Sequence, residues 1–444
     1  MNELLLVAKP PRGGDFLDIA KRIEQEKKFL EPEKASLEAI KATVSLFQRE
    51  VENISLVKGY RIVDVVAAGS APRKTFLPGK LEVDLFARLE KARSKEDLES
   101  FIHDVAPLLA ERLGIEFILK YAENPYGHFL LPLALLNLPP VHGQDRIQVD
   151  LVVTVHTTRE ALPAALKISG MARTPFHVEY LAKAITDDLA TEVRLFKHWL
   201  KLKRIYGQVS FTGFLAELLV IKFGSFLSIL QNAEQISRLK QDFHGRAIAG
   251  LEKKFNFPLV LITDPTDPDR NAAAGITGTL GEIKMKRFVS EARKSLAEPE
   301  TMFEPLKPPS ERLEAVIHFG KEIINPDEVF TRLGRIAVKT SNQMKQEGYQ
   351  LTDVFIEPDQ SKFILVFENY FLAVIERKGP PVKAKRHADK FLKKHREVVT
   401  RDGHLYSLVN NRFHSAREAM DHYIGSNKSC QSHEIKYYPP EKAS

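Results

Sequence analysis

The chain has 444 residues, 43% of them hydrophobic and 28% charged, with a formal net charge of +7. These values exclude a fibrous or largely disordered protein, and the length predicts two to four domains. The single cysteine, Cys430, excludes an internal disulfide and a thiolate metal cage, and low cysteine use is typical of a reducing compartment. The positive charge favours a polyanionic partner.

The sequence contains no stretch that is apolar for long enough to cross a membrane. The longest apolar stretch, residues 129–136, contains Pro132 and falls far below spanning length. The first six residues are apolar apart from Asn2 and Glu3, but charged and proline residues follow at once, unlike a signal peptide. We therefore expect a cytoplasmic protein without a membrane partner.

The first part of the chain predicts a small α/β domain over residues 1–185. Apolar positions at three- and four-residue spacing predict helix over residues 16–53, and helix is expected again over 95–113. Apolar and β-branched runs predict strands over residues 61–68, 81–89, 115–121 and 147–155. Gly69-Ser70, directly after the first strand, begins either a short helix or a turn.

Helical periodicity dominates residues 186–297, most clearly over 192–202 and 213–231, and predicts a helical central domain. The last domain, residues 298–444, opens on a Pro- and Glu-rich linker. A strand, a helix and two strands are then expected at residues 315–319, 326–347, 351–357 and 362–376. This β-α-β-β order is common in RNA-binding domains.

A basic helical segment follows these elements. Its candidate RNA-binding residues are Lys383, Lys385, Arg386, Lys393 and Lys394. Positive charge gathered on one side of a helix is what binding to RNA phosphates requires, whereas charge without that asymmetry would only make the helix soluble.

Three acidic residues in strand-like segments point to metal-dependent chemistry. Because side chains two residues apart on a strand point to the same face, Glu82 and Asp84 face one way while the alternate apolar residues face the core. Asp150 lies inside the apolar strand 147–155, where a lone carboxylate is costly unless it is paired or bound to metal. The three carboxylates therefore favour a cation between them.

The Gly69-Ser70 pair precedes these acids and is suited to bind phosphate. A helix N-terminus there would offer free N–H groups, Gly69 would let the backbone approach a ligand closely, and Ser70 would cap the helix or bind an oxygen. Arg73 and Lys74 add positive charge to the same segment. Together these parts predict a triphosphate site.

Hard carboxylate oxygens suit Mg²⁺, so we predict that Glu82, Asp84 and Asp150 bind two magnesium ions and catalyse an in-line nucleotidyl transfer. One ion would lower the pKa of an attacking hydroxyl. The other would hold the triphosphate and stabilise the leaving pyrophosphate. The protein itself would mainly position the reactants and neutralise charge.

These residues resemble those of the archaeal-type (class I) CCA-adding enzymes, which are tRNA nucleotidyltransferases of the polymerase-β superfamily. Residues 69–86 are similar to the family's Gly-Ser-x-x-Arg-x-Thr run, which ends on Glu-x-Asp, and Asp150 resembles its third carboxylate. Further similar blocks lie at residues 173–177, 192–197, 206–207, 213–219, 223–226, 264–271 and 377–380. The resemblance spans nearly the whole chain.

The resemblance implies an α+β multidomain protein with a polymerase-β-like nucleotidyltransferase head, a helical central domain and a C-terminal β-α-β-β RNA-binding domain with a basic tail. It implies that the triphosphate and ribose of CTP or ATP are held by Ser70, Arg73, His177, Lys197 and Tyr206. Thr174 would lie beside the nucleotide, and Arg270 would present donors to the base edge. The implied partner is the acceptor arm of tRNA, and the family often forms homodimers.

The sequence departs from the family pattern at three places, the first being Pro72 and Lys74, which replace the commoner small and polar residues. Asn124 stands where the family often has histidine, and an apolar insert, residues 130–141, could extend a hairpin or cover a partner surface. The leading interpretation is addition and repair of the 3′-terminal CCA of tRNA. One alternative is a poly(A)- or oligoadenylate-type polymerase, and another is an RNA-binding relative that has lost catalysis.

Overall fold

The computed structural model describes residues 13–79, 81–123, 130–137, 147–207, 210–319, 326–395, 397–427 and 430–439. The chain divides into two compact units. The first unit contains Met1–Gly275 and Arg287–Pro305, and the second contains Ile276–Lys286 and Leu306–Ser444. Asn124 and residues 138–141 of the apolar insert lie outside the described residues.

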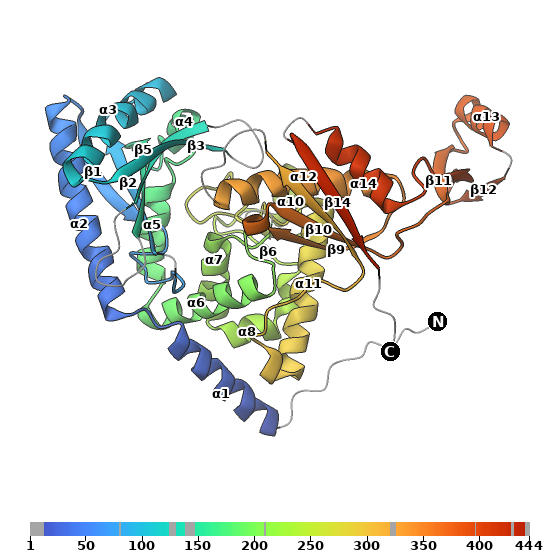
Figure 1. Ribbon diagram of the computed structural model, residues 1–444, viewed down its shortest axis with the longest axis horizontal. Coiled ribbons are helices and arrows are strands. Elements are labelled where there is room, and N and C mark those ends of the chain that lie inside the picture. The colour runs from blue at the N-terminus through green and yellow to red at the C-terminus, as the bar shows by residue number, and fades with distance from the viewer. Residues whose placement is uncertain are drawn as a thin grey trace. The chain divides into compact units, whose positions relative to one another are not determined.

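A five-stranded sheet in the first unit carries the three predicted carboxylates (Figure 1). Its strands, in spatial order, are β1 (Ile62–Ala68), β2 (Leu81–Leu89), β5 (Ile147–Val155), β4 (Leu130–Asn137) and β3 (Glu116–Glu123). β2 and β5 run parallel, and the other neighbouring strands pair antiparallel. The four expected strands of this region are confirmed, and the first part of the apolar insert forms β4, which pairs with β3 as a hairpin.

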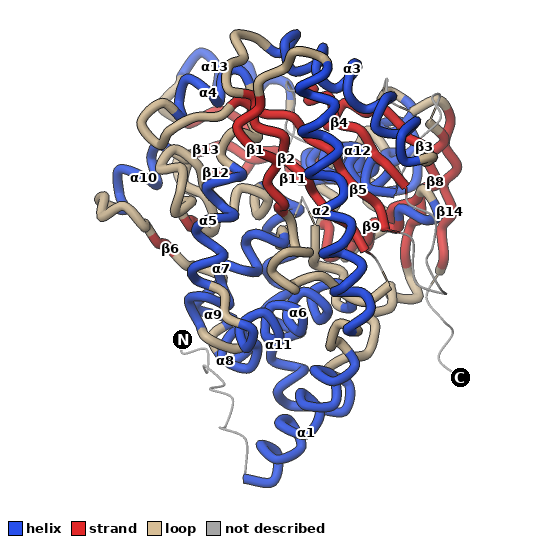
Figure 2. Tube along the Cα trace, turned by 90° about the vertical axis from the view of Figure 1, so that its left-hand side faces the viewer, coloured by secondary structure: helices blue, strands red, loops and turns tan. Residues whose placement is uncertain are grey.

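One face of this sheet packs against two long helices, α2 (Lys34–Val57) and α3 (Lys95–Leu113) (Figures 1 and 2). Val83 and Leu85 of β2 are fully buried in this core. Each such side chain stabilises the fold by about 1.5–3 kcal/mol. A slip of one residue in strand register would turn the acids of β2 into this core, so burial of the apolar set fixes which face the acids occupy.

The opposite face of the sheet is partly covered further along the same two strands. Phe86 and Val152 pack there with Met171 and with Val178, which belongs to helix α5 (Thr174–Ala184). Asp84 and Asp150 lie two residues before Phe86 and Val152 on this face, and Glu82 lies two residues before Asp84. The sheet therefore presents them next to a helix that carries two of the predicted nucleotide-binding residues.

The remainder of the first unit is mostly helical, as the sequence predicts. It comprises α1 (Gly13–Phe29), α4 (Leu162–Ile168), α6 (Asp187–Leu202), α7 (Gly213–Phe223), α8 (Phe226–Gln231), α9 (Ala233–Ile236), α10 (Ile248–Lys254), the short parallel strands β6 (Lys240–Gln241) and β7 (Leu261–Ile262), and the 3₁₀ turn η1 (Pro299–Thr301). Helix α11 (Gly278–Ala297) begins in the second unit and ends in the first. The core of this helical part of the first unit contains five fully buried aromatic residues: Phe196, Trp199, Phe211, Phe226 and Phe288.

The second unit contains two antiparallel sheets. The first has the order β14-β8-β10-β9 and packs with α12 (Pro326–Gln346) and α14 (Ala416–Gly425). Its strands are β8 (Arg312–His318), β9 (Leu351–Glu357), β10 (Lys362–Phe367) and β14 (Ser432–Tyr438), with the 3₁₀ turn η2 (Pro358–Gln360) between β9 and β10. The expected strand-helix-strand-strand order is thus present as β8, α12, β9 and β10.

The other sheet of this unit has the order β11-β13-β12 and was not expected from the sequence. It consists of β11 (Val374–Pro381), β13 (His404–Asn410) and β12 (Val398–Arg401), and α13 (Lys385–Lys394) packs on it. The expected single strand over residues 362–376 is wrong. The chain leaves the first sheet after Phe367, buries Tyr370, and enters the second sheet at Val374.

Other differences from the expected elements have local causes. The helix expected over residues 16–53 is two helices, interrupted around Pro32, because proline cannot continue a helical hydrogen-bond ladder. Gly224, with φ of 79°, ends α7 within the helix expected over 213–231. After Gly69-Ser70 the structure shows the turn and not the helix, and Lys74 there has a left-handed φ of 55°.

No helix within the described part of the chain combines the length and the apolarity needed to cross a bilayer.

Candidate active site

The pairing of β2 with β5 brings two of the predicted carboxylates side by side. Asp84 and Asp150 are direct register partners on these parallel strands, and Glu82 lies two residues before Asp84. All three side chains are half-buried on the face opposite the α2–α3 core. The strand alternation and the register together place three carboxylates, which are hard oxygen donors, on one face of the sheet.

Gly69 lies directly against Asp84. A Cβ atom added to Gly69 would come within 1.7 Å of Asp84 Oδ2, and Gly69 also has a left-handed φ of 67°. Both facts require glycine at this position. The turn after β1 is therefore packed onto the carboxylate, with Thr75 N donating to Ser70 O across the turn at 3.0 Å.

Gln148, which the sequence did not single out, is the neighbour of Asp150 on the same face of β5. Its Nε2 donates to Asp150 Oδ1 at 2.7 Å. No group of three or more His, Cys, Asp or Glu side chains converges on one point among the described residues. The carboxylates fit a divalent cation by their chemistry and by their shared face, and binding would draw them together.

Two predicted nucleotide-binding residues, Arg73 and Lys197, meet in a buried ion cluster around Glu217. Arg73 Nη2 donates to Glu217 Oε2 at 3.0 Å, and Lys197 Nζ donates to Glu217 Oε1 at 3.0 Å. Thr75 Oγ1 donates to Glu217 Oε1 at 2.8 Å. The cluster ties the turn after Gly69 to helices α6 and α7, and its two cations and one anion leave one net positive charge.

Burial and pairing act in opposite directions on the acid and bases of this cluster. Burial raises the pKa of Glu217, but attraction to Lys197 and Arg73 outweighs it, so the pKa lies below its ordinary value of 4.5. Burial lowers the pKa of Lys197, and the positive charge of Arg73 adds to that effect while Glu217 opposes it. One carboxylate is paired with two cations. Glu217 therefore stays charged, while the pKa of Lys197 lies below its ordinary value.

Tyr206 lies beside Lys197 because Gly213, the first residue of α7, leaves room for both. A Cβ atom at Gly213 would be 2.9 Å from Tyr206 Oη and 3.7 Å from Lys197 Nζ. The Lys201 ammonium lies 5.5 Å from the Tyr206 ring centroid. The predicted ribose- and phosphate-binding residues of the central domain thus meet at the start of one helix.

A second cluster forms around Asp264 and contains two more predicted residues. His177 Nε2 lies 2.6 Å from Asp264 Oδ2, and Arg270 Nη1 donates to the same oxygen at 2.8 Å. The His177 ring stacks on Phe214 with centroids 4.3 Å apart. Burial raises the pKa of Asp264, yet the hydrogen bond and charge of His177 hold it well below its usual range.

The other predicted residues of the first unit are less constrained. Ser70 is half-buried in the turn beside Gly69, and Thr174 is half-buried as the first residue of α5. Arg173, directly before it, is paired with Asp267 at 3.1 Å. Thr174 is thus held on the same helix as His177, less than one turn away.

The basic residues predicted to bind RNA lie on and next to α13 in the second unit. The helix packs through Ala388, which is buried, and Phe391, whose ring occupies the space where a Cβ of Gly379 would be. The five predicted residues, Lys383, Lys385, Arg386, Lys393 and Lys394, are all exposed, and Lys390 of the same helix is exposed as well. Positive charge therefore covers the side of α13 that faces away from its sheet.

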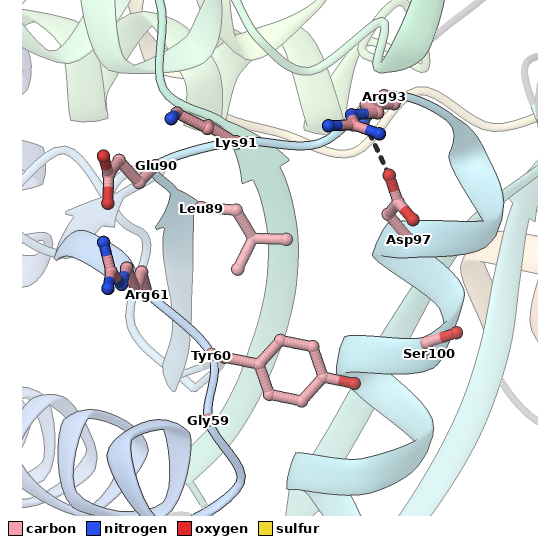
Figure 3. Close-up of a pocket in the computed structure, with 9 residues that line it drawn as sticks. All are labelled: Gly59, Tyr60, Arg61, Leu89, Glu90, Lys91, Arg93, Asp97 and Ser100. Carbon is pink, nitrogen blue, oxygen red and sulfur yellow. Dashed lines mark hydrogen bonds between the residues drawn. The ribbon is translucent and has the colours of Figure 1, made fainter.

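A cavity of about 410 Å³ lies elsewhere in the first unit, at the end of β2 that is distant from Gly69 (Figure 3). It is lined by Gly59, Tyr60, Arg61, Leu89, Glu90, Lys91, Arg93, Asp97 and Ser100. Its lining includes both cations and carboxylates, and Figure 3 marks a hydrogen bond between Arg93 and Asp97, which the backbone N of Arg93 donates to Asp97 Oδ2. None of the predicted site residues lines this cavity.

Sequence reasoning missed four side chains that organise the site: Gln148, Phe214, Glu217 and Asp264. Glu217 offered a usable signal, since it is a lone acid within the otherwise apolar segment 214–221. Asp264 lies two residues after the end of the apolar strand β7. However, Arg73 lies 144 residues from Glu217 and His177 lies 87 residues from Asp264, so these pairings could not be read from spacing.

Comparisons with known proteins identify the family of the chain. Residues 191–304 match the second domain of the tRNA nucleotidyltransferase family, and residues 312–438 match the C-terminal domain of the CCA-adding enzyme family. The chain is therefore a tRNA nucleotidyltransferase.

Individual relatives define the family more narrowly. A CCA-adding enzyme of Pyrobaculum aerophilum is 30% identical over 72% of this chain and 72% of its own length. One from Haloarcula marismortui is 30% identical over 75% and 72%, and one from Methanocaldococcus jannaschii is 27% identical over 86% of both chains. The chain belongs to the CCA-adding enzymes, a family that uses divalent metal ions.

Among solved structures, that of a CdnC from E. coli MS115-1 with ATP gives a TM-score of 0.45 at 16% identity, covering 64% of this chain and 91% of that one. A TM-score of this size is too low to define a shared fold.

Gly69→Ala tests the packing of the turn against Asp84. We expect loss of nucleotidyl transfer, because Asp84 Oδ2 must move away from the new methyl group. Gly79→Ala is the matched control, since Gly79 also has a positive φ, 84°, but no atom within 4 Å of an added Cβ. Both variants should lose about 1–2 kcal/mol of unfolding free energy from the left-handed backbone. Equal transfer rates in the two variants would contradict the proposed contact.

Glu217→Gln tests the ion cluster. Removing the anion leaves two buried cations without their counter-charge, so the free energy of unfolding in urea should fall by about 3–5 kcal/mol. Glu179→Gln, which breaks an exposed pair with Lys183, should change it by less than about 1 kcal/mol.

The same variant has a predicted pH dependence. Because folding lowers the pKa of Glu217, its contribution to stability is present above the ordinary pKa of 4.5 and is lost as the pH falls through the folded pKa. The stability of Glu217→Gln should therefore depend less steeply on pH in the acid range than that of the wild type. A parallel acid limb in the two proteins would show that Glu217 is not held charged.

Proposed function

We propose that this protein adds and repairs the 3′-terminal CCA of tRNA from CTP and ATP, with release of pyrophosphate. The observation that carries the proposal is the register of Asp84 beside Asp150, with the Gly69-Ser70 turn packed against Asp84. Membership of the CCA-adding enzymes supports the choice of substrates. The protein would act in the cytoplasm.

In this proposal Glu82, Asp84 and Asp150 hold divalent cations, and Mg²⁺ is the best candidate because all three donors are hard oxygens. The cations would activate the terminal hydroxyl of the tRNA and stabilise the leaving pyrophosphate. Gln148 orients Asp150 by its hydrogen bond to Oδ1. Gly69 lets the backbone of the turn lie against Asp84, so triphosphate and carboxylates share one small volume.

The nucleotide would lie between the sheet face and the start of α7. Ser70 would bind a phosphate oxygen from the turn. Arg73 and Lys197 would attract the triphosphate with the one positive charge that their cluster keeps, while Glu217 holds both side chains in place. Tyr206, beside Lys197, would contact the ribose.

The base would be read in the Asp264 cluster. Arg270 keeps 37% of its side chain exposed, so its guanidinium retains donors for a base edge. His177 and Thr174 lie on α5 and would flank the nucleotide. Protein side chains, rather than a nucleic acid template, would therefore select between C and A.

The tRNA would be bound by its acceptor arm. We propose that Lys383, Lys385, Arg386, Lys393 and Lys394 contact its phosphates, since these side chains are exposed on and next to α13. The chain would then consist of a catalytic domain at residues 1–185, a central domain at 186–297 and a tRNA-binding part at 298–444. A homodimer is also proposed: light scattering should give twice the mass of one chain, and the mass of one chain would refute the dimer.

A poly(A)- or oligoadenylate-type polymerase is distinguished by nucleotide use. Such an enzyme would extend RNA with A alone, whereas the proposed enzyme adds C, C and A and then stops. An RNA-binding relative without catalysis would incorporate neither nucleotide.

Asp84→Ala should abolish transfer while RNA affinity changes by less than about twofold, because Asp84 is proposed to hold metal rather than RNA. The measurement is CMP incorporation together with a gel-shift titration of tRNA. Asp64→Ala is the control: Asp64 belongs to the neighbouring strand β1 and pairs with Arg88. It should retain transfer. Turnover by Asp84→Ala would refute the assignment of Asp84 as a metal ligand.

A further inference from the structure

Asp264 is a fully buried carboxylate that joins two proposed nucleotide-binding side chains. Its exposed fraction is 0%. A single oxygen, Oδ2, is bonded both to His177 Nε2 at 2.6 Å and to Arg270 Nη1 at 2.8 Å. His177 belongs to α5 and Arg270 to the loop after β7, so Asp264 fixes the distance between two elements that are remote in sequence.

The carboxylate is itself held rigidly by its own loop. Thr266 donates to the other oxygen, Oδ1, from its backbone N and from Oγ1, both at 2.9 Å. The backbone N of Asp264 donates to Arg270 O at 2.9 Å, and His244 Nε2 lies 2.8 Å from Asp264 O. Four contacts therefore define where Oδ2 lies before any ligand arrives.

Phe214 restrains both partners from another side. The His177 ring stacks on it at 4.3 Å, and the guanidinium carbon of Arg270 lies 5.6 Å from its centroid. Arg270 is thus held between an aromatic ring and a carboxylate while more than a third of its side chain stays exposed. A guanidinium fixed in this way presents its remaining donors in one direction, which is what discrimination between base edges requires.

The charge of the carboxylate does not vary near neutral pH. Burial alone would raise the pKa of Asp264, but the hydrogen bond and charge of His177, the Thr266 amide and the charge of Arg270 lower it well below the usual range. The clamp on Arg270 is therefore present whenever the protein is folded near neutral pH.

We propose that Asp264 is a positioning residue for nucleotide selection: it orients Arg270, with His177 and Phe214, so that the site discriminates CTP from ATP at each step. This inference rests on the proposed function. Asp264 does not touch the reacting atoms, so its loss should alter selection more than the rate of transfer.

The test compares Asp264→Asn with the wild-type full chain. Asparagine keeps the size of the side chain but removes the charge that holds Arg270. The assay measures kcat and KM for CTP and for ATP on a tRNA that lacks only its terminal A. We expect the preference for ATP, as the ratio of kcat/KM values, to fall about tenfold, the effect of losing one orienting hydrogen bond. The nucleotide KM should rise, while kcat for ATP stays within about twofold.

Two further variants show whether Asp264 acts through Arg270. Arg270→Ala should lower the same ratio, and the Asp264→Asn/Arg270→Ala double variant should match Arg270→Ala alone, because the residue being oriented is gone. Phe214→Leu, which removes the other restraint on Arg270, should also lower the ratio, and it provides the test if Asp264→Asn does not fold.

The matched control is Asp242→Asn. Asp242 is also a buried carboxylate, 3% exposed, and pairs with an arginine, Arg246, at 2.8 Å, but it contacts neither His177 nor Arg270. Its nucleotide preference should equal that of the wild type. A loss of preference in Asp242→Asn equal to that in Asp264→Asn would show a general effect of disturbing this region and would overturn the proposal.

The outcomes separate the inference from the proposed function. If the wild type incorporates neither C nor A, or only A-tails, the proposed function fails. If the wild type completes CCA but folded Asp264→Asn and Phe214→Leu keep its nucleotide preference, only the role of Asp264 is refuted. Additive losses in the double variant would likewise refute an action through Arg270.

Discussion

The parallel register between β2 and β5 is the constraint on which the rest of the site depends. It sets Asp84 directly beside Asp150, and burial of the alternate valine and leucine residues against α2 and α3 prevents the strands from slipping. Gly69 then brings the turn after β1 onto Asp84, so the backbone proposed to bind phosphate lies directly against one of the carboxylates. The proposed catalytic centre for nucleotidyl transfer therefore depends on one strand register and one glycine.

Helix α7 contacts residues of both the proposed phosphate site and the proposed base-reading cluster. Gly213 admits Tyr206 and Lys197, Phe214 supports His177 and Arg270, and Glu217 holds Lys197 and Arg73. These contacts come from little more than one turn of a single helix. A displacement of α7 would therefore change the proposed phosphate, ribose and base contacts together, which favours a site that is preorganised as a unit.

The sequence predicted those parts of the site that are encoded locally. The Glu82–Asp84 face and the strand around Asp150 follow from two-residue alternation, and the structure confirms both strands. The sequence around Gly69 does not distinguish a helix from a turn, because a glycine-serine pair precedes both. The structure shows a turn, in which Lys74 has a left-handed φ. The roles of Glu217 and Asp264 depend on distant partners: Arg73 and Thr75 are more than 140 positions from Glu217, and His177 is 87 positions from Asp264. Likewise, the short, exposed strands of the β11-β13-β12 sheet carry too little apolar alternation to be recognised in advance.

The most direct measurement of the central claim is stepwise extension of tRNA transcripts that end before the first C, before the second C and before the A. Each would be supplied with Mg²⁺ and with CTP and ATP, singly and together. The account predicts C from CTP on the first two ends, A from ATP on the third, and a stop after CCA. Long tails of A, or no incorporation despite tRNA binding, would contradict it.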